Sequence, residues 1–205
     1  MSLPPTALDV DEEETPAPVK TRSRSRSLTE WGIVVVVAVI VSLLIRTFVF
    51  QTFFIPSGSM EPTLQIGDRI IVSKLSVEFG TIHTGDILVF KAPKAVATVC
   101  GDNVADLVKR VIGLPGQTLT SKGNTIYYKN PGDQTWHRLK QPWLQPGVPL
   151  GKAIGTVHVT SNHYFMVGDN ESDSCDSRYW GTIPRSSIIG KAFLRIWPLS
   201  RFDFL

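Results

Sequence analysis

Two serines separated by one residue are the first candidates for chemistry in this sequence. Ser57 and Ser59 lie in the stretch PSGSM, with Gly58 between them. A serine hydroxyl is a poor nucleophile until a neighbouring base removes its proton. None of the 4 histidines stands in a recognisable triad setting, and the chain has no G-x-S-x-G turn. A nucleophilic serine here therefore needs a base other than histidine.

Lys109 is the candidate for that base. A lysine amine accepts a proton only when neutral, so its pKa must fall by several units from about 10.4. Burial among apolar groups lowers the pKa of a lysine. Lys109 lies in DLVKRVIGLPG, a strand-like pattern that places it on the same face as Leu107 and Val111. We therefore predict that the fold brings Ser59 and Lys109 together.

The segments that must position these residues have the pattern of short β-strands. β-Branched or aromatic runs are separated by Gly, Pro, Asn and Asp, and no segment after residue 50 keeps a helical period over three turns. The sequence predicts a mainly β domain over residues 51–205, a twisted and partly closed sheet, with an irregular insertion around 123–156. The runs are RIIVSKL, GDILVF, LVKRVIGL, NTIYYK, VHVTSNHYFMVGD and SIIGKAFLRIW.

The first 50 residues have a different composition. Residues 1–27 carry prolines, an acidic run and KTRSRSRS, which predicts a disordered tail. The uncharged run WGIVVVVAVIVSLLI predicts a transmembrane helix within an anchor over residues 28–50. The alternatives are a buried core segment or a cleaved signal peptide, although no small-x-small site follows the run. Basic residues just before the run predict a cytoplasmic N-terminus and an extracytoplasmic domain.

Length and composition limit the number of domains and the kinds of function that the chain can have. A chain of 205 residues is long enough for one core with appendages. A net charge of +3 is too small to argue for nucleic acid. The 2 cysteines exclude a dense disulfide framework, and the 4 histidines are scattered, so we expect no metal site.

Three stretches of this chain together resemble a known family. IPSGSMEPTLQIGDRIIVSK, LVKRVIGLPGQ and MVGDNESDSCDSRYWGTIP are similar, in this order, to the characteristic blocks of bacterial type I signal peptidases. Members of that family cleave signal peptides at the outer face of the cell membrane with a Ser/Lys dyad, and their fold resembles that of the self-cleaving SOS repressors. The resemblance implies signal-peptide-bearing preproteins and the lipid bilayer as partners, and no cofactor.

The resemblance also implies roles for single residues. Ser59 matches the nucleophile and Lys109 the general base. Ser57 matches the serine whose hydroxyl forms an oxyanion hole with the backbone N–H of Ser59. The third block supplies Ser174, which would orient the lysine amine, and the charged pair Asp176 and Arg178. The residues expected to form shallow apolar substrate pockets are Ile55, Pro56, Met60, Leu64, Leu107 and Val108.

Several residues of the third block have other expected roles or depart from the family. We expect Asp169 and Asn170 to form a turn rather than to act in catalysis. Glu171 begins a stretch that is more often basic in the family, and Cys175 stands where a small residue is common. An exported domain meets an oxidising space, so Cys175 could be bridged to Cys100 if the chain folds back at CGDN. Two independent cysteines are the alternative.

Two other functions fit the same sequence. One is a specialised relative that processes a single partner, such as a pilin-like or conjugation protein. The other is a membrane-anchored binding module that has no catalytic activity. The joint presence of Ser57, Ser59, Lys109 and Ser174 favours an enzyme.

Overall fold

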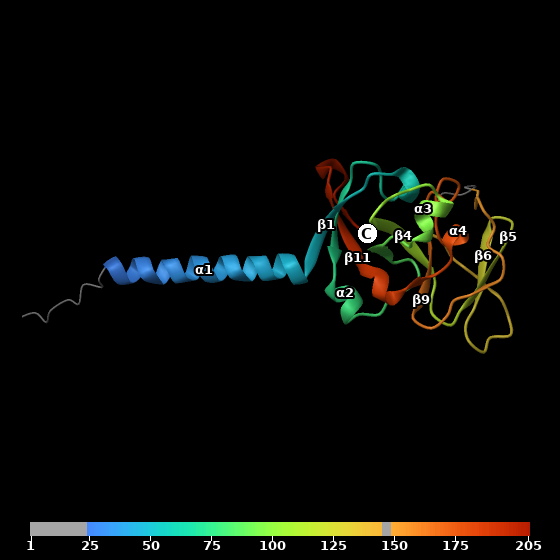
Figure 1. Ribbon diagram of the computed structural model, residues 1–205, viewed down its shortest axis with the longest axis horizontal. Coiled ribbons are helices and arrows are strands. Elements are labelled where there is room, and N and C mark those ends of the chain that lie inside the picture. Colours follow the sequence, from blue (N-terminus) through green and yellow to red (C-terminus); the bar gives the residue numbers. More distant parts are fainter. Residues whose placement is uncertain (1–23, 145–148) are drawn as a thin grey trace, which may run out of the picture. The chain divides into compact units, whose positions relative to one another are not determined.

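The computed structural model of the chain describes residues 24–144 and 149–205 (Figure 1). The chain divides into two compact units, Met1–Ser42 and Leu43–Leu205. Most of the predicted tail lies outside the described residues. Its last four residues do not: helix α1 spans Arg24–Phe48 and so begins before the predicted start of the anchor at residue 28.

Helix α1 exposes apolar side chains in consecutive positions. Trp31 is 67% exposed, and the residues from Ile33 to Val37 are all more than half exposed. Because five consecutive residues cover more than one helical turn, the apolar surface surrounds the helix rather than forming one stripe. Over the residues that the structure describes, no helix is both long enough and apolar enough to cross a membrane.

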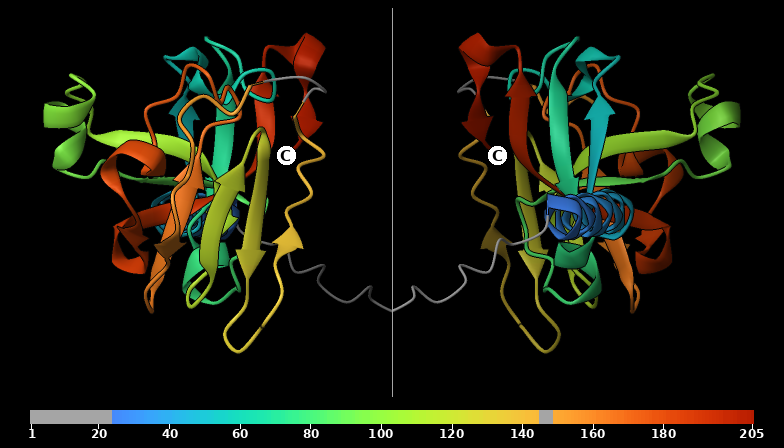
Figure 2. Two further views of the ribbon diagram at one scale, coloured as in Figure 1. Left: turned by 90° about the vertical axis from the view of Figure 1, so that its right-hand side faces the viewer. Right: turned by 90° about the vertical axis from the view of Figure 1, so that its left-hand side faces the viewer.

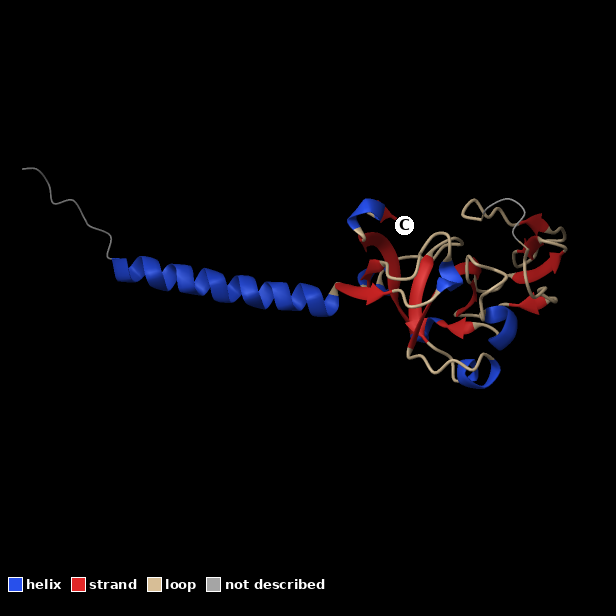
Figure 3. Ribbon diagram, turned by 90° about the horizontal axis from the view of Figure 1, so that it is seen from above, coloured by secondary structure: helices blue, strands red, loops and turns tan. Residues whose placement is uncertain are grey.

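An antiparallel sheet of eight strands carries the predicted site (Figures 1 and 3). One strand near its margin, β2 (Arg69–Ser73), has Ile70 and Val72 fully buried, while the other residues of the strand are more exposed. The mainly β prediction is confirmed. In spatial order the strands are β1 (Phe50–Phe54), β2 (Arg69–Ser73), β11 (Ile188–Trp197), β3 (Ile87–Lys91), β4 (Asp106–Gly113), β9 (His163–Val167) and β10 (Ile183–Pro184), with β12 (Asp203–Phe204) paired to β11.

Hydrophobic clusters cover both faces of this sheet. On the central strand β3, Ile87 and Val89 belong to one cluster, whereas Leu88 and Phe90 belong to another. Successive residues of a strand point to opposite faces, so the two clusters lie on opposite sides of β3. The sheet is therefore buried on both faces at its centre, where β3 pairs with β4.

The predicted insertion around residues 123–156 is not wholly irregular. Together with its flanks it forms a second antiparallel sheet of four strands. Strands of this sheet are seen side by side in the left view of Figure 2. Leu119 and Ile126 are fully buried in a hydrophobic cluster of this region, and their burial on one face of the sheet is the reason that the strands form. The predicted runs contain β6 and β8 but neither β5, which has one apolar residue in five, nor β7, which has only two residues, so the sheet itself was not predicted. The strands are β7 (His137–Arg138), β6 (Thr125–Lys129), β5 (Thr118–Lys122) and β8 (Val157–His158).

Short helices connect the strands of the domain. None of those described after residue 50 exceeds five residues, in line with the absence of a helical period in the sequence. The α-helices are α2 (Leu75–Glu78), α3 (Ala95–Val99) and α4 (Ser177–Trp180), and the 3₁₀ turns are η1 (Gly58–Met60), η2 (Arg185–Ser187) and η3 (Leu199–Arg201).

Candidate active site

Ser59 lies in the 3₁₀ turn η1, between β1 and β2. Ser57 precedes the turn in an extended conformation, with φ of −132° and ψ of 156°. Met60 follows Ser59 and is almost completely buried in the hydrophobic core. The turn is therefore anchored by an apolar side chain on one side of Ser59, while Ser59 itself stays half-buried at the surface of the domain.

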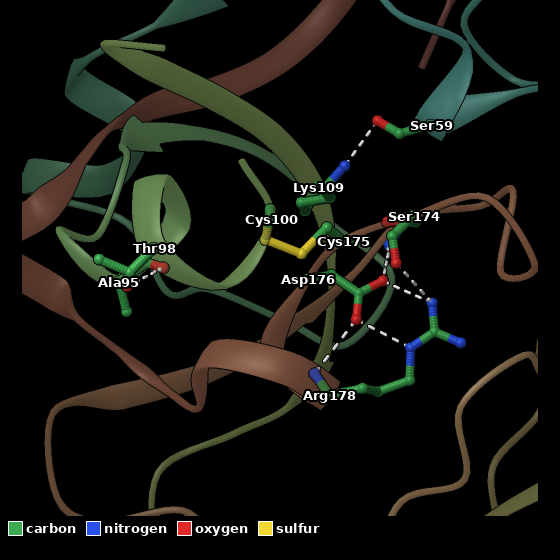
Figure 4. Close-up of a disulfide and its surroundings, with 10 residues drawn as sticks. Ser59, Ala95, Thr98, Cys100, Lys109, Ser174, Cys175, Asp176 and Arg178 are labelled. Atoms are coloured by element: carbon green, nitrogen blue, oxygen red, sulfur yellow. Dashed lines mark hydrogen bonds and ion pairs between the residues drawn. A yellow bond between two sulfur atoms is a disulfide. The ribbon is translucent and has the colours of Figure 1, made fainter. Parts of the chain in front are cut away.

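Lys109 reaches Ser59 from strand β4. Its side chain is only 2% exposed, and its Nζ lies 2.5 Å from Ser59 Oγ. Figure 4 shows the two side chains pointing toward one another from separate segments of the chain. The hydrogen bond places a base within proton-transfer distance of the hydroxyl.

Burial lowers the pKa of the Lys109 amine, which makes the neutral form more available to accept a proton. Removal from water lowers the pKa of Lys109 from 10.5 to about 8. The carboxylate of Asp176 acts in the opposite direction, because it favours the charged ammonium, and the guanidinium of Arg178 again lowers the pKa. A substantial fraction of neutral amine is therefore present near pH 8, unlike for a lysine in water.

Asp176 and Arg178 form a fully buried ion pair beside the lysine (Figure 4). Arg178 donates from Nε to Oδ1 at 2.8 Å and from Nη2 to Oδ2 at 2.7 Å, a two-bond geometry. Asp176 also accepts from the backbone N–H of Gly168 at 3.1 Å, and Arg178 donates to the carbonyl of Leu150. The pair therefore connects Asp176 to the residue that follows β9 and Arg178 to the segment between β7 and β8.

Ser174 is buried, but the predicted hydrogen bond to the lysine amine is not formed. Within the described residues, Ser174 Oγ has no hydrogen-bond partner. It lies close to Gly168: a Cβ on that glycine would collide with Ser174 Oγ and with the carbonyl oxygen of Ser59. Ser174 is thus packed near the Ser59 turn, at a place where the absence of a side chain at residue 168 permits close approach.

Ser57 lies beside Ser59 at the surface. Its Oγ is 3.4 Å from Ser59 Oγ, and its side chain is exposed. A hydroxyl in this position can turn toward an oxygen of a bound peptide, because its torsion is not restrained by burial.

A cleft of about 580 Å³ opens at the Ser59–Lys109 pair. Of the predicted pocket residues, Leu64 does not line it: Leu64 is completely buried in the core, so that prediction is wrong. Within residues 24–144 and 149–205, no group of three or more His, Cys, Asp or Glu side chains is placed to hold a metal ion. The predicted residues that do line the cleft are Ile55, Pro56, Met60, Leu107 and Val108.

Asp169 and Asn170 do more than form a turn. Asp169 is buried and accepts two hydrogen bonds from Arg110, the residue after Lys109. Asn170 donates from its backbone N–H to the carbonyl of Ser59 at 3.1 Å. The sequence contained one signal for this role, since Asp169 follows a continuous apolar run and a buried carboxylate needs a cationic partner.

Cys100 and Cys175 are bonded to each other, with their Cα atoms 6.0 Å apart. Figure 4 shows the disulfide next to Lys109, on the side away from Ser59. The chain folds back as the bridge requires: α3 ends at Val99, and the Cα of the following Cys100 approaches the third block. The bond joins the segment that leads into β4 to the segment that carries Ser174 and Asp176.

A serine hydroxyl hydrogen-bonded to a buried, readily neutralised lysine, at the wall of a peptide-sized cleft, is the arrangement of a serine hydrolase whose base is lysine. The comparisons with known proteins agree with this class. The sequence pattern of the family described as signal peptidase, peptidase S26, matches residues 28–197. The chain belongs to this family of serine proteases.

Individual relatives cover most of the chain. A probable signal peptidase I-2 of Synechocystis sp. is 39% identical over 86% of this chain and 76% of its own length. A signal peptidase I of Leptolyngbya laminosa is 37% identical over 82% of this chain and 79% of its own. Among solved structures, a signal peptidase I of Enterococcus faecalis V583 overlaps 54% of this chain and 96% of its own, with 24% identity and a TM-score of 0.42.

Proposed function

We propose that this protein removes signal peptides from exported proteins, with Ser59 as nucleophile and Lys109 as general base. The observation that carries the proposal is the 2.5 Å hydrogen bond between Lys109 Nζ and Ser59 Oγ at the cleft wall. Membership of the signal peptidase family supports preproteins as the substrate class. Neither of the alternatives, a single-partner protease or a binding module, has a feature of the structure in its favour.

The reaction follows from these two groups. Neutral Lys109 accepts the proton of Ser59 while Ser59 Oγ attacks the carbonyl carbon of the scissile bond. The negative charge that develops on the carbonyl oxygen would be stabilised by the Ser57 hydroxyl and the backbone N–H of Ser59. As the C–N bond breaks, the Lys109 ammonium donates its proton to the departing amine, which leaves an ester on Ser59.

The second half of the reaction uses the same base. Lys109, again neutral, accepts a proton from water as the water oxygen attacks the ester carbonyl. The C–O bond to Ser59 breaks, the hydroxyl recovers its proton from Lys109, and the signal peptide departs with a new carboxyl end. The charges of Asp176 and Arg178 act on the Lys109 amine in opposite directions, and burial lowers its pKa enough for the neutral form to be available.

The cleft suits an extended peptide with small side chains. The chain before Ser59 is extended, and β4 carries Leu107 and Val108 on the other side of the cleft. An extended substrate can lie between these two segments as an added strand. Ile55 and Met60 are almost completely buried where they meet the cleft, so the apolar pockets between the segments are shallow and favour a small-x-small site.

We further propose that α1 holds the enzyme in the cell membrane, with the N-terminus cytoplasmic and the domain outside. An all-round apolar helix such as α1 is stable only when lipid or protein covers it. The domain itself also exposes apolar groups: Phe54 is 58% and Trp197 51% exposed, and both lie in register with Arg69 across β1, β2 and β11. This shared face would rest on lipid, where membrane-bound substrates arrive.

The purified full-length protein in detergent, incubated with a preprotein, tests the reaction. Mass spectrometry should find cleavage after a small-x-small site. Ser59→Ala and Lys109→Ala should each abolish cleavage, whereas Ser161→Ala and Lys122→Ala, at exposed positions away from the cleft, should not. Turnover by the Lys109→Ala protein would remove lysine from the base role. Digestion of residues 1–27 by protease added outside intact cells would reverse the proposed orientation.

A further inference from the structure

Asn170 contacts the backbone on both sides of the Ser59 Cα atom. Its backbone N–H donates to the carbonyl of Ser59 at 3.1 Å, and its side-chain Nδ2 donates to the carbonyl of Gly58 at 3.3 Å. These carbonyls belong to the two peptide groups that meet at the Ser59 Cα. Because each peptide group is planar, holding both fixes φ and ψ of Ser59. The direction in which its Cβ projects is fixed as well, and the hydrogen bond from Lys109 Nζ then selects the position of Oγ.

The Asn170 side chain is itself oriented by its neighbours. Its Oδ1 accepts a hydrogen bond from Ser172 Oγ at 3.2 Å, which leaves the NH₂ group facing Gly58. Its backbone carbonyl accepts from the N–H of Asp173 at 3.0 Å, closing a turn. The amide is therefore presented to the nucleophile turn by a segment that is held in place independently.

The residue before Asn170 holds the other half of the dyad. Asp169 binds Arg110 through hydrogen bonds of 2.7 and 2.6 Å, and Arg110 directly follows Lys109 on β4. One planar peptide group joins Asp169 to Asn170. Asp169 and Asn170 therefore link β4, which carries Lys109, to η1, which carries Ser59. This short connection limits how far Ser59 and Lys109 can separate.

We infer that Asn170 is a positioning residue that holds Ser59 Oγ against the Lys109 amine. The inference rests on the proposed function of the Ser59–Lys109 pair. Asn170 does not line the cleft and so acts through Ser59 rather than on the substrate. Its removal should slow the chemical step and leave substrate binding unchanged.

Asn170→Ala removes the bond to Gly58 and keeps the backbone bond to Ser59. Because small displacements of a reacting group cost up to about 10²-fold in rate, we expect kcat to fall by roughly 10- to 100-fold with KM within about twofold. Asn170→Asp has the same shape, but its carboxylate cannot donate to the Gly58 carbonyl, so its kcat should fall at least as far. The control is Asn124→Ala, at an exposed turn between β5 and β6, which should leave kcat unchanged.

A second measurement needs no turnover. In a Ser59→Cys protein, Lys109 would promote formation of the thiolate, and iodoacetamide alkylates the thiolate. Cys100 and Cys175 are bonded to each other, so residue 59 carries the reactive thiol. Adding Asn170→Ala should slow alkylation by roughly tenfold if Asn170 holds residue 59 against the lysine. A purely structural role would lower the melting temperature and speed alkylation instead, because the thiol would become more accessible.

The outcomes separate this inference from the proposed function. Unchanged kcat in both Asn170 variants, or unchanged or faster alkylation in the Ser59→Cys background, would overturn the positioning role. If Asn170→Ala does not fold, the Asn170→Asp protein of equal size decides both measurements. A native protein that cleaves no preprotein would end the proposed function, and the alkylation rates would still decide whether Asn170 positions residue 59.

Discussion

Arg110 binds Asp169 in a buried two-bond ion pair, with Nε 2.7 Å from Oδ1 and Nη2 2.6 Å from Oδ2. Arg110 also donates to the carbonyl of Gly85 at 2.7 Å, and its guanidinium lies 4.6 Å from the ring centre of Trp143. The pair therefore joins the strand that carries Lys109 to the block that contacts Ser59.

Asp169→Asn should be strongly destabilising, because it leaves the guanidinium of Arg110 buried without a counter-charge. Loss of one partner of a buried pair costs about 3–5 kcal/mol, which denaturant unfolding would measure. Asp203→Asn is the matched control: Asp203 is 69% exposed and 3.9 Å from Arg195, so its loss should cost at most about 1 kcal/mol. Equal unfolding free energies for the two variants would contradict a structural role for the pair.

The rate of cleavage should rise with pH and level off above about pH 8. Lys109 must be neutral to accept the Ser59 proton, and its pKa is lowered to about 8 by burial. Below that pH the amine is protonated, and kcat/KM falls about tenfold per pH unit. A profile of kcat/KM from pH 6 to 10.5 measures this rise and the plateau that follows it. A rate that still climbs at pH 10 would mean that the amine titrates as an ordinary exposed lysine.

Ser57→Ala should reduce kcat by roughly 10²–10³-fold and change KM little, because loss of one oxyanion donor affects the transition state more than the bound substrate. Steady-state kinetics on a preprotein would show this. Ser59→Ala is the reference for complete loss. If the Ser57→Ala protein were equally inactive, the assignment of the two serines, 3.4 Å apart through their Oγ atoms, would have to be reversed.

Glu171→Gln should stabilise the protein at pH 8 and have no effect below pH 4.5. Burial raises the pKa of Glu171 from 4.5 to about 7, while a hydrogen bond from Gln141 at 2.8 Å opposes the shift. Because the folded state holds the proton more tightly, the contribution of the carboxyl group to stability is full below pH 4.5 and is lost as the pH rises through about 7. Melting temperatures of both proteins at pH 4 and pH 8 test this. A stabilisation that is equal at both values would contradict it.

Protein purified without reductant should show no titratable thiol after denaturation, and two after reduction, because Cys100 and Cys175 are bonded to each other. The bridge closes a loop with a sequence separation of 75 residues. Its removal by Cys100→Ser/Cys175→Ser should therefore cost about 2–5 kcal/mol in unfolding free energy. Two free thiols before reduction would show that the cysteines are independent.

Strands with strong alternation of apolar and polar residues could be predicted from the sequence, and so could the burial of Lys109. Lys109 was predicted to be buried because an apolar strand pattern surrounds it, and the structure has it almost completely buried. Its contact with Ser59 joins positions 50 residues apart, which no local pattern encodes. The pairing was predicted from chemical need, because a nucleophilic serine without a histidine requires another base, and the family resemblance agreed with it.

Other features depended on tertiary packing that composition does not reveal. The family resemblance predicts Leu64 for the cleft, yet its side chain is completely buried in the core. Asn170 has the residue type of a turn former, and its bonds to Gly58 and Ser59 become visible only when distant segments meet. The second sheet was not predicted because β5 has a single apolar residue and β7 is too short for a periodic signal.

The order of two neighbouring residues on β4 makes its pairing a condition for catalysis as well as for folding. Lys109 lies opposite Leu88 and Arg110 opposite Ile87 in the ladder with β3. A slip of one residue in that ladder would exchange the two faces of the strand. It would present to Ser59 a guanidinium, which cannot give up its proton in a protein, and would bury the amine against Asp169. Such a misregistered molecule could retain its secondary structure and its net charge and yet be chemically inert.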